Sequence, residues 1–327
     1  MRPLVLKGHE RAITKVKYNR EGDLLFSSAK DKLPTVWYSD TGERLGTYNG
    51  HNGVVWCLDV SFDTSCLLTG SGDNSCCLWD CETGTLVNRL GSPTAVRAVG
   101  FSYSSNTFFY STDQRMTQNC SLDVFDTRDK NAMAKGEACI KIPILKSRIT
   151  SALWGHLDYI IITGNENGEI CQFDIRRDSS DPVNFLTEHK RAVMDLQTSS
   201  DEIMLLSASK DQTAKLFDAQ NFIHLKTYQS ERPVNSAAIS PTRDHIVLGG
   251  GEEAMKVTQT DTRQGQFEAK FYHLIFQEEF ARVRGHFGPI NSLVFHPDGK
   301  SYASGGEDGY VRVHVFDDDY FDFDLDY

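Results

Sequence analysis

The chain has 327 residues, of which 39% are hydrophobic, and carries 34 Lys and Arg against 45 Asp and Glu, for a net charge of −11. This composition can build a large core and excludes bulk disorder. The acidic balance argues against direct binding of nucleic acid through its phosphates and favours a basic partner.

No apolar stretch approaches the roughly 18 residues of a membrane span. The apolar run near the N-terminus, Leu4-Val5-Leu6, is too short for a signal peptide. We therefore expect no membrane association and a cytosolic or nuclear location, where thiols stay reduced.

The first predicted element is a strand at Pro3–Leu6, just before a Gly-His pair. Four units then share one spacing rule, in which a histidine precedes an aspartate by 22 residues and a ring side chain follows the aspartate six residues later. The histidines are His9, His51, His189 and His286; the aspartates are Asp31, Asp73, Asp211 and Asp308; the ring residues are Trp37, Trp79, Phe217 and His314.

Weaker copies of the turn end at Asp113, Asn167 and Glu252, which makes seven turns with a unit of about 40 to 45 residues. Each unit contains short apolar runs such as ITKVKY and CCLWD, separated by turn signals such as NREGD. Four strands at this period predict an all-β, seven-bladed WD-repeat β-propeller. We expect the propeller to span residues 1–316, followed by an acidic-aromatic tail at 317–327, with the N-terminal strand completing the last blade so that no sheet edge stays open.

The segment SGDNSCCLWDC, residues 71–81, could be a metal site, a nucleophile site or neither. Cys77 and Cys81 have no second cysteine pair at a zinc-finger distance, so we expect free thiols and no metal. Ser71, His51 and Asp73 are the residue types of a hydrolytic triad. Their spacing recurs in several units, whereas a catalytic site occurs once, so we expect no catalysis and no cofactor.

The same residues predict a structural network, in which the indole N–H bonds a serine, the serine bonds the histidine and the histidine holds the aspartate. Such a chain satisfies polar groups that would otherwise be buried unpaired. In this interpretation Ser71 supplies the hydroxyl of the network in the second blade and Ser209 supplies it in the fifth. Ala29 and Gly306 stand at the serine position of the first and seventh blades, so the network there is incomplete.

Two insertions interrupt the repeat. Residues 115–137 are polar and predict a loop around a strand, SLDVFD. Residues 262–284 carry Phe267, Phe271, Phe276 and Phe280, whose spacing fits either a helix or strands, and their end, FARVR, fits the fourth strand of blade six.

Two places are candidates for partner binding. The first is the rim of blades five and six, where Asp218 and Phe222 should lie by the turn between the third and fourth strands and offer an acid beside an exposed aromatic. Tyr320 and Phe321 lie in the tail, which is either a solvated terminus or an anchoring strip.

Several stretches resemble the i-subunit family of eukaryotic translation initiation factor three: GHERAITKVKYNREGDLLFSSAKD, VWYSDTGERLGTYNGH, ERPVNSAAISP, GGGEEA, FEAKFYH and GHFGPINSLVFHPDGKSYASGGEDGYVR. The acidic-aromatic tail is similar too, while residues 115–145 and 176–186 match least. The resemblance implies a cytoplasmic, non-enzymatic scaffold that acts in assembly of the small-subunit preinitiation complex and in mRNA recruitment. It also implies binding to the b subunit, through that subunit's C-terminal segment, and to the g subunit, with contact to the small ribosomal subunit through the complex.

The repeat spacing alone predicts a propeller and not a role in translation. A WD adaptor of another assembly is the second hypothesis. An enzyme is the third, and it lacks a phosphate loop, a metal constellation and an unshared triad.

Overall fold

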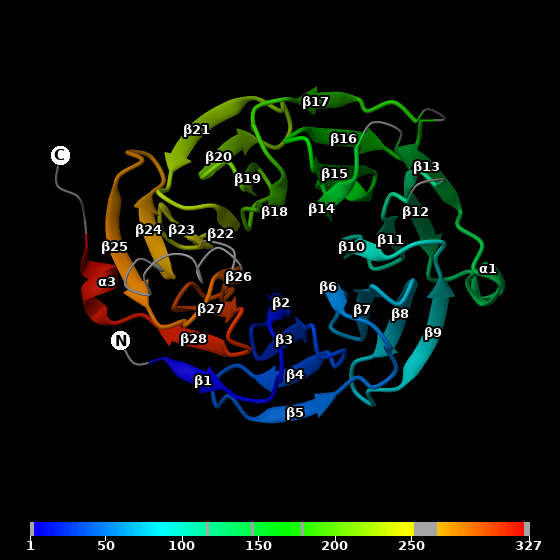
Figure 1. The fold of residues 1–327 in the computed structure, drawn as a ribbon, viewed down its shortest axis with the longest axis horizontal. Coiled ribbons are helices and arrows are strands. Elements are labelled where there is room, and N and C mark those ends of the chain that lie inside the picture. Colours follow the sequence, from blue (N-terminus) through cyan, green and yellow to red (C-terminus); the bar gives the residue numbers. More distant parts are fainter. Residues whose placement is uncertain (1–2, 116–117, 145–146, 178–179, 252–266, 324–327) are drawn as a thin grey trace.

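The computed structural model describes residues 3–115, 118–144, 147–177, 180–251 and 267–323. Seven four-stranded antiparallel sheets stand in a ring (Figure 1), which confirms the seven-bladed all-β propeller. In each of the first six blades the strands follow chain order from the innermost to the outermost.

The strand bounds follow the predicted units closely. Blade one holds β2 (Ile13–Tyr18), β3 (Leu24–Ala29), β4 (Thr35–Tyr38) and β5 (Arg44–Thr47). Blade two holds β6 (Val55–Val60), β7 (Cys66–Ser71), β8 (Ser75–Asp80) and β9 (Leu86–Gly91). Blade three holds β10 (Val96–Phe101), β11 (Thr107–Thr112), β12 (Cys120–Asp126) and β13 (Ile140–Ile144). Blade four holds β14 (Ile149–Trp154), β15 (Ile160–Asn165), β16 (Ile170–Asp174) and β17 (Asn184–Leu186), with a 3-10 turn at His156–Asp158.

The remaining blades complete the circle. Blade five holds β18 (Val193–Thr198), β19 (Met204–Ser209), β20 (Thr213–Asp218) and β21 (His224–Gln229). Blade six holds β22 (Val234–Ile239), β23 (His245–Gly250), β24 (Glu268–His273) and β25 (Glu279–Arg284). Blade seven holds β26 (Ile290–Phe295), β27 (Ser301–Gly306), β28 (Val311–Val315) and the N-terminal strand β1 (Leu4–Leu6).

The N-terminal strand closes the ring as predicted. β1 pairs antiparallel with β28, with Leu4 opposite Val313 and Leu6 opposite Val311. The first and last parts of the chain therefore share one sheet, and the edge of β28 is covered.

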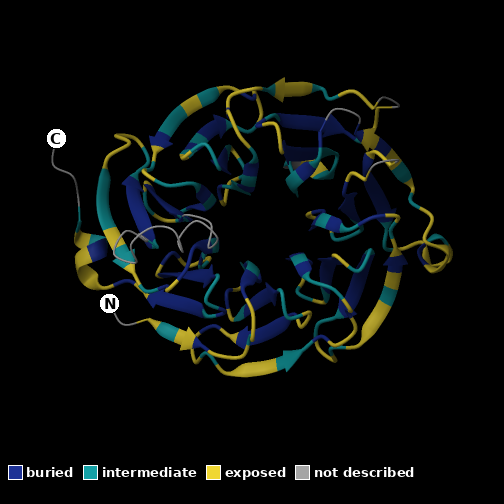
Figure 2. Ribbon diagram, in the orientation of Figure 1, coloured by how far each residue is buried: buried dark blue, intermediate teal, exposed yellow. Residues whose placement is uncertain are grey.

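The core lies between neighbouring blades. One apolar cluster joins Phe26 and Tyr48 of blade one to Leu58, Leu67 and Trp79 of blade two. Figure 2 shows the buried residues on the middle strands and most of the exposed residues on outer strands and loops. Each blade thus buries its faces only by stacking on the next, which is why a closed ring is needed.

The two insertions adopt regular structure. The first contains the expected strand, β12, but also a helix that was not expected, α1 (Lys130–Lys135). Asp129 caps its N-terminus, Gly136 ends it with a φ of 70°, and Met133 is buried in the apolar cluster shared by blades two and three. In the second insertion Phe271 and Phe280 lie in strands and not in a helix, Phe267 directly precedes the first of them and Phe276 lies in the turn between them. These strands, β24 and β25, are the third and fourth of blade six, so the FARVR assignment is confirmed. Residues 262–266 lie outside the described part.

A bulge recurs in the innermost strand of every blade. The register between the first and second strands shifts directly after the first residue of the inner strand, as between Ile13 and Lys15 in blade one. A bulge re-aims side chains. Seven bulged residues are placed in this way, and all seven line one cavity of the ring: Thr14, Trp56, Arg97, Thr150, Met194, Asn235 and Asn291.

Candidate functional site

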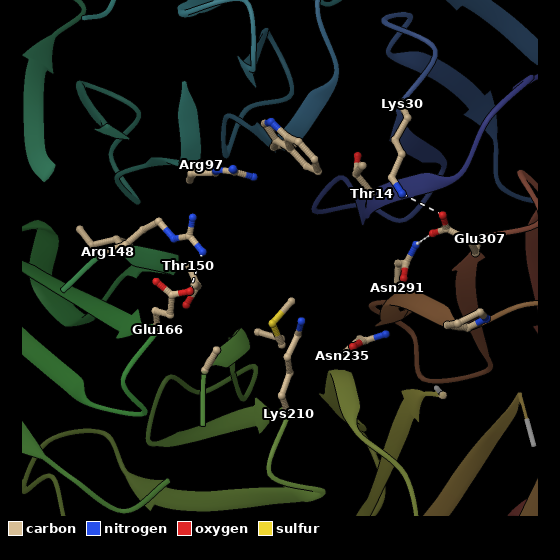
Figure 3. Close-up of a pocket in the computed structure, with 16 residues that line it drawn as sticks. Thr14, Lys30, Arg97, Arg148, Thr150, Glu166, Lys210, Asn235, Asn291 and Glu307 are labelled. Carbon is tan, nitrogen blue, oxygen red and sulfur yellow. Dashed lines mark hydrogen bonds and ion pairs between the residues drawn. The ribbon is translucent and has the colours of Figure 1, made fainter. Parts of the chain in front are cut away.

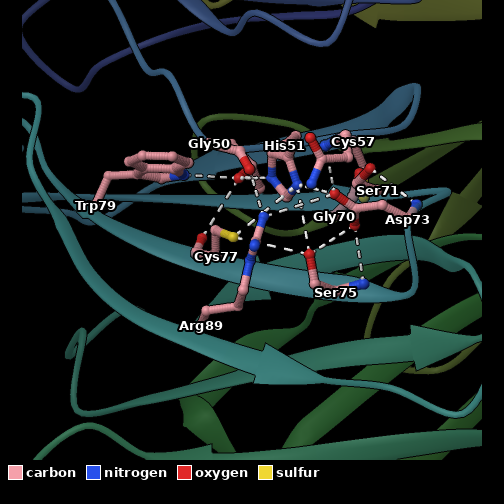
Figure 4. A network of polar contacts seen from close by, with 12 residues as sticks. Gly50, His51, Cys57, Gly70, Ser71, Asp73, Ser75, Cys77, Trp79 and Arg89 are labelled. Carbon is pink, nitrogen blue, oxygen red and sulfur yellow. Dashed lines mark hydrogen bonds and ion pairs between the residues drawn. The ribbon is translucent and has the colours of Figure 1, made fainter.

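Four blades contain the predicted histidine network, but its hydroxyl comes from another position. In blade two, Trp79 Nε1 donates to Thr69 Oγ1 at 2.8 Å, and the same oxygen lies 2.8 Å from His51 Nε2. His51 Nδ1 lies 3.0 Å from the carboxylate of Asp73 (Figure 4). Ser71 is not part of this hydrogen-bond network. Its Oγ accepts the Asp73 N–H at 3.1 Å and supports the turn.

The assignments of Ser71 and Ser209 to the network were therefore wrong, and the cause is strand register. Trp79 pairs with Leu67 across the sheet, so its indole reaches the hydroxyl two residues further on, at Thr69. Ser71 lies another two residues away, about 7 Å along the strand. In blade five the same geometry gives Ser207, whose Oγ is 2.6 Å from His189 Nε2, in place of Ser209.

Blades one and seven also have the hydroxyl that was thought to be missing. Ser27 Oγ accepts from Trp37 Nε1 at 2.8 Å and lies 2.7 Å from His9 Nε2, so blade one has a complete network. In blade seven, Ser304 lies 2.8 Å from His286 Nε2. All four hydroxyls precede the turn aspartate by four residues, a signal that was readable in the sequence.

Electrostatics fix the charge state of the blade-two network. Burial opposes ionisation of Asp73, but hydrogen bonds from Ser75, the Asn52 N–H and His51 outweigh it and lower the pKa of Asp73 to about 2. Burial lowers the pKa of His51, against the attraction of Asp73. A neutral imidazole held by an ionised carboxylate satisfies every hydrogen-bond donor of the network.

The cysteines of residues 71–81 are strand residues. Cys76 and Cys77 are fully buried in β8, and burial raises the pKa of both thiols. All eight cysteines are free, and no group of three His, Cys, Asp or Glu side chains suited to a metal ion occurs among the described residues.

The structure changes the picture of the predicted partner site on blade five. Phe222 is not the exposed aromatic that was expected: only 5% of it is accessible, and it packs with Phe217 and Leu205. Asp218 is partly exposed, and its carboxylate accepts the backbone N–H groups of Gln220 and Asn221 at 2.8 and 3.0 Å. These bonds and that from the Asn221 side chain lower the pKa of Asp218.

Two isoleucines supply the apolar surface that Phe222 does not. Ile223 is 56% exposed and Ile203 is 51% exposed. The Ala219 N–H donates to the Ile203 carbonyl at 2.8 Å, which brings the two turns side by side. We call Asp201, Ile203, Asp218 and Ile223 the blade-five patch. A cavity of about 360 Å³ lies beside it, lined from blade four by Tyr159 and Ile160 and from blade five by Ala219.

The other candidates, in the tail, face the propeller. Residues Asp318–Asp322 form a short helix, α3, in which Tyr320 is buried. The Tyr320 ring stacks on Phe316 with centroids 3.9 Å apart, and its hydroxyl lies 3.0 Å from His245 Nδ1. Phe321 is half-buried, 5.4 Å from the Tyr320 ring. The described part of the tail is therefore an anchoring strip against blade six, and Tyr320 is not a free surface residue.

The cavity at the mouth of the ring was not predicted. It has a volume of about 550 Å³ and is lined by the seven bulged residues and by Lys30, Arg148, Glu166, Lys210 and Glu307 (Figure 3). Thr14 and Thr150 each donate to a carbonyl of the next blade, as do Asn235 and Asn291. Trp56, Arg97 and Met194 make no such bond within the described residues. These residues stand at corresponding positions of their blades, and only the bulges show that the side chains face the cavity.

None of the helices described is long and apolar enough to cross a bilayer. The family model EIF3I matches residues 1–326 of the chain. Proteins named eukaryotic translation initiation factor 3 subunit I from Taeniopygia guttata and Danio rerio are each 57% identical over 326 residues, and that from Homo sapiens is 56% identical over 326 residues. In all three comparisons the match covers 100% of both chains. A family model that spans nearly the whole propeller, with relatives at this identity, shows that the chain belongs to the EIF3I family.

Proposed function

We propose that the protein is a non-enzymatic scaffold subunit of eukaryotic translation initiation factor 3. It acts in the cytoplasm, in assembly of the small-subunit preinitiation complex and in mRNA recruitment. The observation that carries the proposal is the full-length match to subunit I proteins, with 57% identity to two of them. A ring of rigid blades suits this role because it presents a preorganised surface at little ordering cost.

The polar networks support the non-enzymatic part of the proposal. The residues that resemble a triad recur in four blades, and both nitrogens of His51 are already bonded, to Thr69 and Asp73. Thr69, which would be the nucleophile, has no exposed surface and already accepts from the Trp79 indole, so it cannot reach a substrate.

The proposed partners are the b subunit, through its C-terminal segment, and the g subunit. We place the b segment on the blade-five patch. Asp201 and Asp218 supply carboxylates whose pKa values are lowered by hydrogen bonds, from Ser199 and the Ile203 N–H in one case and from Asn221 and Gln220 in the other. Exposed isoleucines with a charged rim and an adjacent cavity suit a basic amphipathic helix, whose apolar face would enter the hollow between blades four and five.

A native pull-down with identification of bound proteins tests the scaffold role. Recovery of the b and g subunits is the expected result. Recovery of a different assembly without either would instead support the adaptor hypothesis.

Binding of the purified chain to the b C-terminal segment tests the residues. Asp218→Lys and Ile223→Ala should each weaken binding by about tenfold or more, since a charged rim and an apolar anchor are lost. Asp80→Lys is the matched control, because Asp80 ends the third strand of blade two and caps the same kind of turn through Thr83. Equal binding by all three variants would reject the patch and leave the scaffold role to the pull-down.

A further inference from the structure

One face of the ring is acidic. Because the strands of a blade alternate in direction, the turns between the first and second strands of all seven blades lie on the same face, which we call the turn face. These turns hold three basic and eight acidic residues. They span residues 19–23, 61–65, 102–106, 155–159, 199–203, 240–244 and 296–300. A surface with this balance favours a basic partner.

Two carboxylates of the turn face have neutral donors around them. Asp63 accepts from two serine hydroxyls of its own turn, at 2.7 and 2.8 Å. Asp158 accepts the backbone N–H groups of Tyr103 and Ser104, at 2.6 and 2.9 Å. Neither carboxylate forms an ion pair with a residue in the described part of the chain. Both therefore keep a negative charge for a cation from another molecule.

Three turns on this face carry a phenylalanine or tyrosine, and two of these rings are covered by an arginine of the same chain. Arg20 Cζ lies 3.9 Å from the centroid of the Phe62 ring. Arg176 Cζ lies 3.6 Å from the centroid of the Tyr159 ring. Tyr103 has no cation over its ring among the residues that the structure describes, and 60% of it is exposed. An accessible aromatic face attracts a cation through the quadrupole of the ring.

The Tyr103 ring is held in place by its neighbours. Phe62 packs against it, with ring centroids 4.2 Å apart and ring planes tilted by 48°. The Phe62 N–H donates to Ser105 Oγ at 3.0 Å and ties the turn of blade two to that of blade three. The bond from the Tyr103 N–H to Asp158 ties blade three to blade four in the same way. A ring fixed like this accepts a partner at little ordering cost.

An exposed leucine directly precedes Asp158 in the chain. Leu157 is 59% exposed and has a φ of 65°, in the left-handed region that a leucine rarely adopts. Asp158 shares this conformation with a φ of 53°, and its carboxylate is directed at the Tyr103 N–H. Backbone strain of this kind persists where the surrounding contacts require it. Leu157 thus offers apolar surface for the aliphatic stem of a bound side chain.

We propose that the turn face of blades two to four binds an arginine side chain, presented by a basic segment of another protein. Its guanidinium lies over the Tyr103 ring and pairs with the carboxylate of Asp63 or Asp158, while its stem packs on Leu157. The chain already shows this pairing within itself, at Phe62 and at the ring of blade four. Single-stranded RNA also stacks on aromatic rings, but the acidic turns repel its phosphates.

Fluorescence anisotropy of the full-length chain tests this proposal. The probes are three labelled peptides of glycine and serine that differ only in one regularly repeated residue: arginine, lysine or citrulline. The arginine peptide should bind at least about tenfold more tightly than the neutral citrulline peptide. It should bind about threefold more tightly than the lysine peptide, because a planar guanidinium stacks on a ring and an ammonium does not. Equal affinity for the three, or no binding of the arginine peptide at millimolar concentration, would overturn the proposal.

Variants of the exposed ring locate the site. Tyr103→Phe should keep the affinity, Tyr103→Trp should raise it about twofold, and Tyr103→Leu should lower it about fivefold, because leucine keeps apolar bulk and has no quadrupole. Tyr38→Leu is the matched control. Tyr38 is a tyrosine of blade one, 44% exposed, at the end of a third strand that reaches the same face. Unchanged binding in Tyr103→Leu, or an equal loss in Tyr38→Leu, would reject the site.

Competition identifies the class of partner. A uridine-rich single-stranded RNA should not displace the arginine peptide. An RNA that binds more tightly than the peptide, and loses affinity in Tyr103→Leu, would refute the assignment to a protein segment. The b C-terminal segment at saturation should leave peptide binding unchanged, because the blade-five patch belongs to another blade. Complete displacement by that segment would show a single shared site and reject a separate surface at Tyr103.

Discussion

Lys15 and Asp195, which are 180 residues apart in the chain, form an ion pair at 2.6 Å across the ring. They belong to blades one and five, which are not neighbours. Asp195 also accepts from the Ser236 hydroxyl and from Gln197 Nε2, and Gln197 in turn donates to the Leu293 carbonyl. The inner strands of blades one, five, six and seven are thus tied together.

Replacing Asp195 should destabilise the whole ring. Asp195→Asn is expected to lower the free energy of unfolding by about 1–3 kcal/mol, because a buried hydrogen-bond network loses an acceptor. Chemical denaturation measures the effect, and a double-mutant cycle with Lys15→Met should show that the two changes are not additive. Additive losses would show that the ion pair does not couple the blades.

Removing the Thr69 hydroxyl of the blade-two network should lower the free energy of unfolding more than removing the Ser71 hydroxyl. Thr69→Val leaves the Trp79 indole and His51 Nε2 without their partner, so we expect a loss of about 1–3 kcal/mol. Thr69→Ser should restore most of it. Ser71→Ala, which removes only an acceptor at the turn, should cost less in the same thermal or denaturant melt. The reverse order would favour the assignment drawn from sequence.

Ring closure can be tested within a single strand. Leu6 is 2% exposed and packs with Trp37 and Val311, whereas its neighbour Val5 is 38% exposed. Leu6→Ala should cost about 2–5 kcal/mol through the cavity that it leaves, and Val5→Ala should cost much less. Deletion of residues 1–6 should lower the melting temperature and promote aggregation through the edge of β28. A deletion that melts like the intact chain would contradict the closure.

Blade seven should make the protein sensitive to mild acid. Burial, with His286 and Arg312 nearby, lowers the pKa of His314 from 6.5 to about 4. The unfolded chain then binds a proton at higher pH than the fold does, so the stability due to this group is full above pH 6.5 and is lost as the pH falls toward 4. His314→Phe keeps the stack on Tyr302 and should flatten the profile of unfolding free energy between these limits. A profile unchanged by the substitution would assign the sensitivity to other groups.

The tail should stabilise blade six without being required for the fold. Deleting residues 317–327 removes the stack of Tyr320 on Phe316 and the bond to His245. We expect a lower melting temperature with unchanged β-sheet circular dichroism, as the division at residue 316 predicts. Tyr320→Phe should lose only the contribution of the hydroxyl, about 1 kcal/mol. Loss of the folded state on deletion would reject that division.

The sequence by itself determined the architecture. Strand alternation, turn residues and the 22-residue spacing from histidine to aspartate are local properties, and each blade repeats them. They located the seven blades, the closing strand before Gly8 and the strand at FARVR, while the predicted turn at Glu252 lies outside the described residues. The hydroxyls of the network were equally present in the pattern, four residues before each aspartate, but choosing between Thr69 and Ser71 needed the cross-strand register of Trp79.

Only the tertiary structure decided what the surfaces present. A one-dimensional pattern does not show which side of a turn faces the core, so Phe222 looked exposed although it packs against Phe217, and Ile223 was overlooked. The cavity at the mouth of the ring was even harder to predict from the sequence. Arg97 and Arg148 both lie beside Asp113, because the inner strands of different blades converge on one axis. Contacts between residues far apart in the chain depend on closure of the whole ring, and no local propensity encodes them.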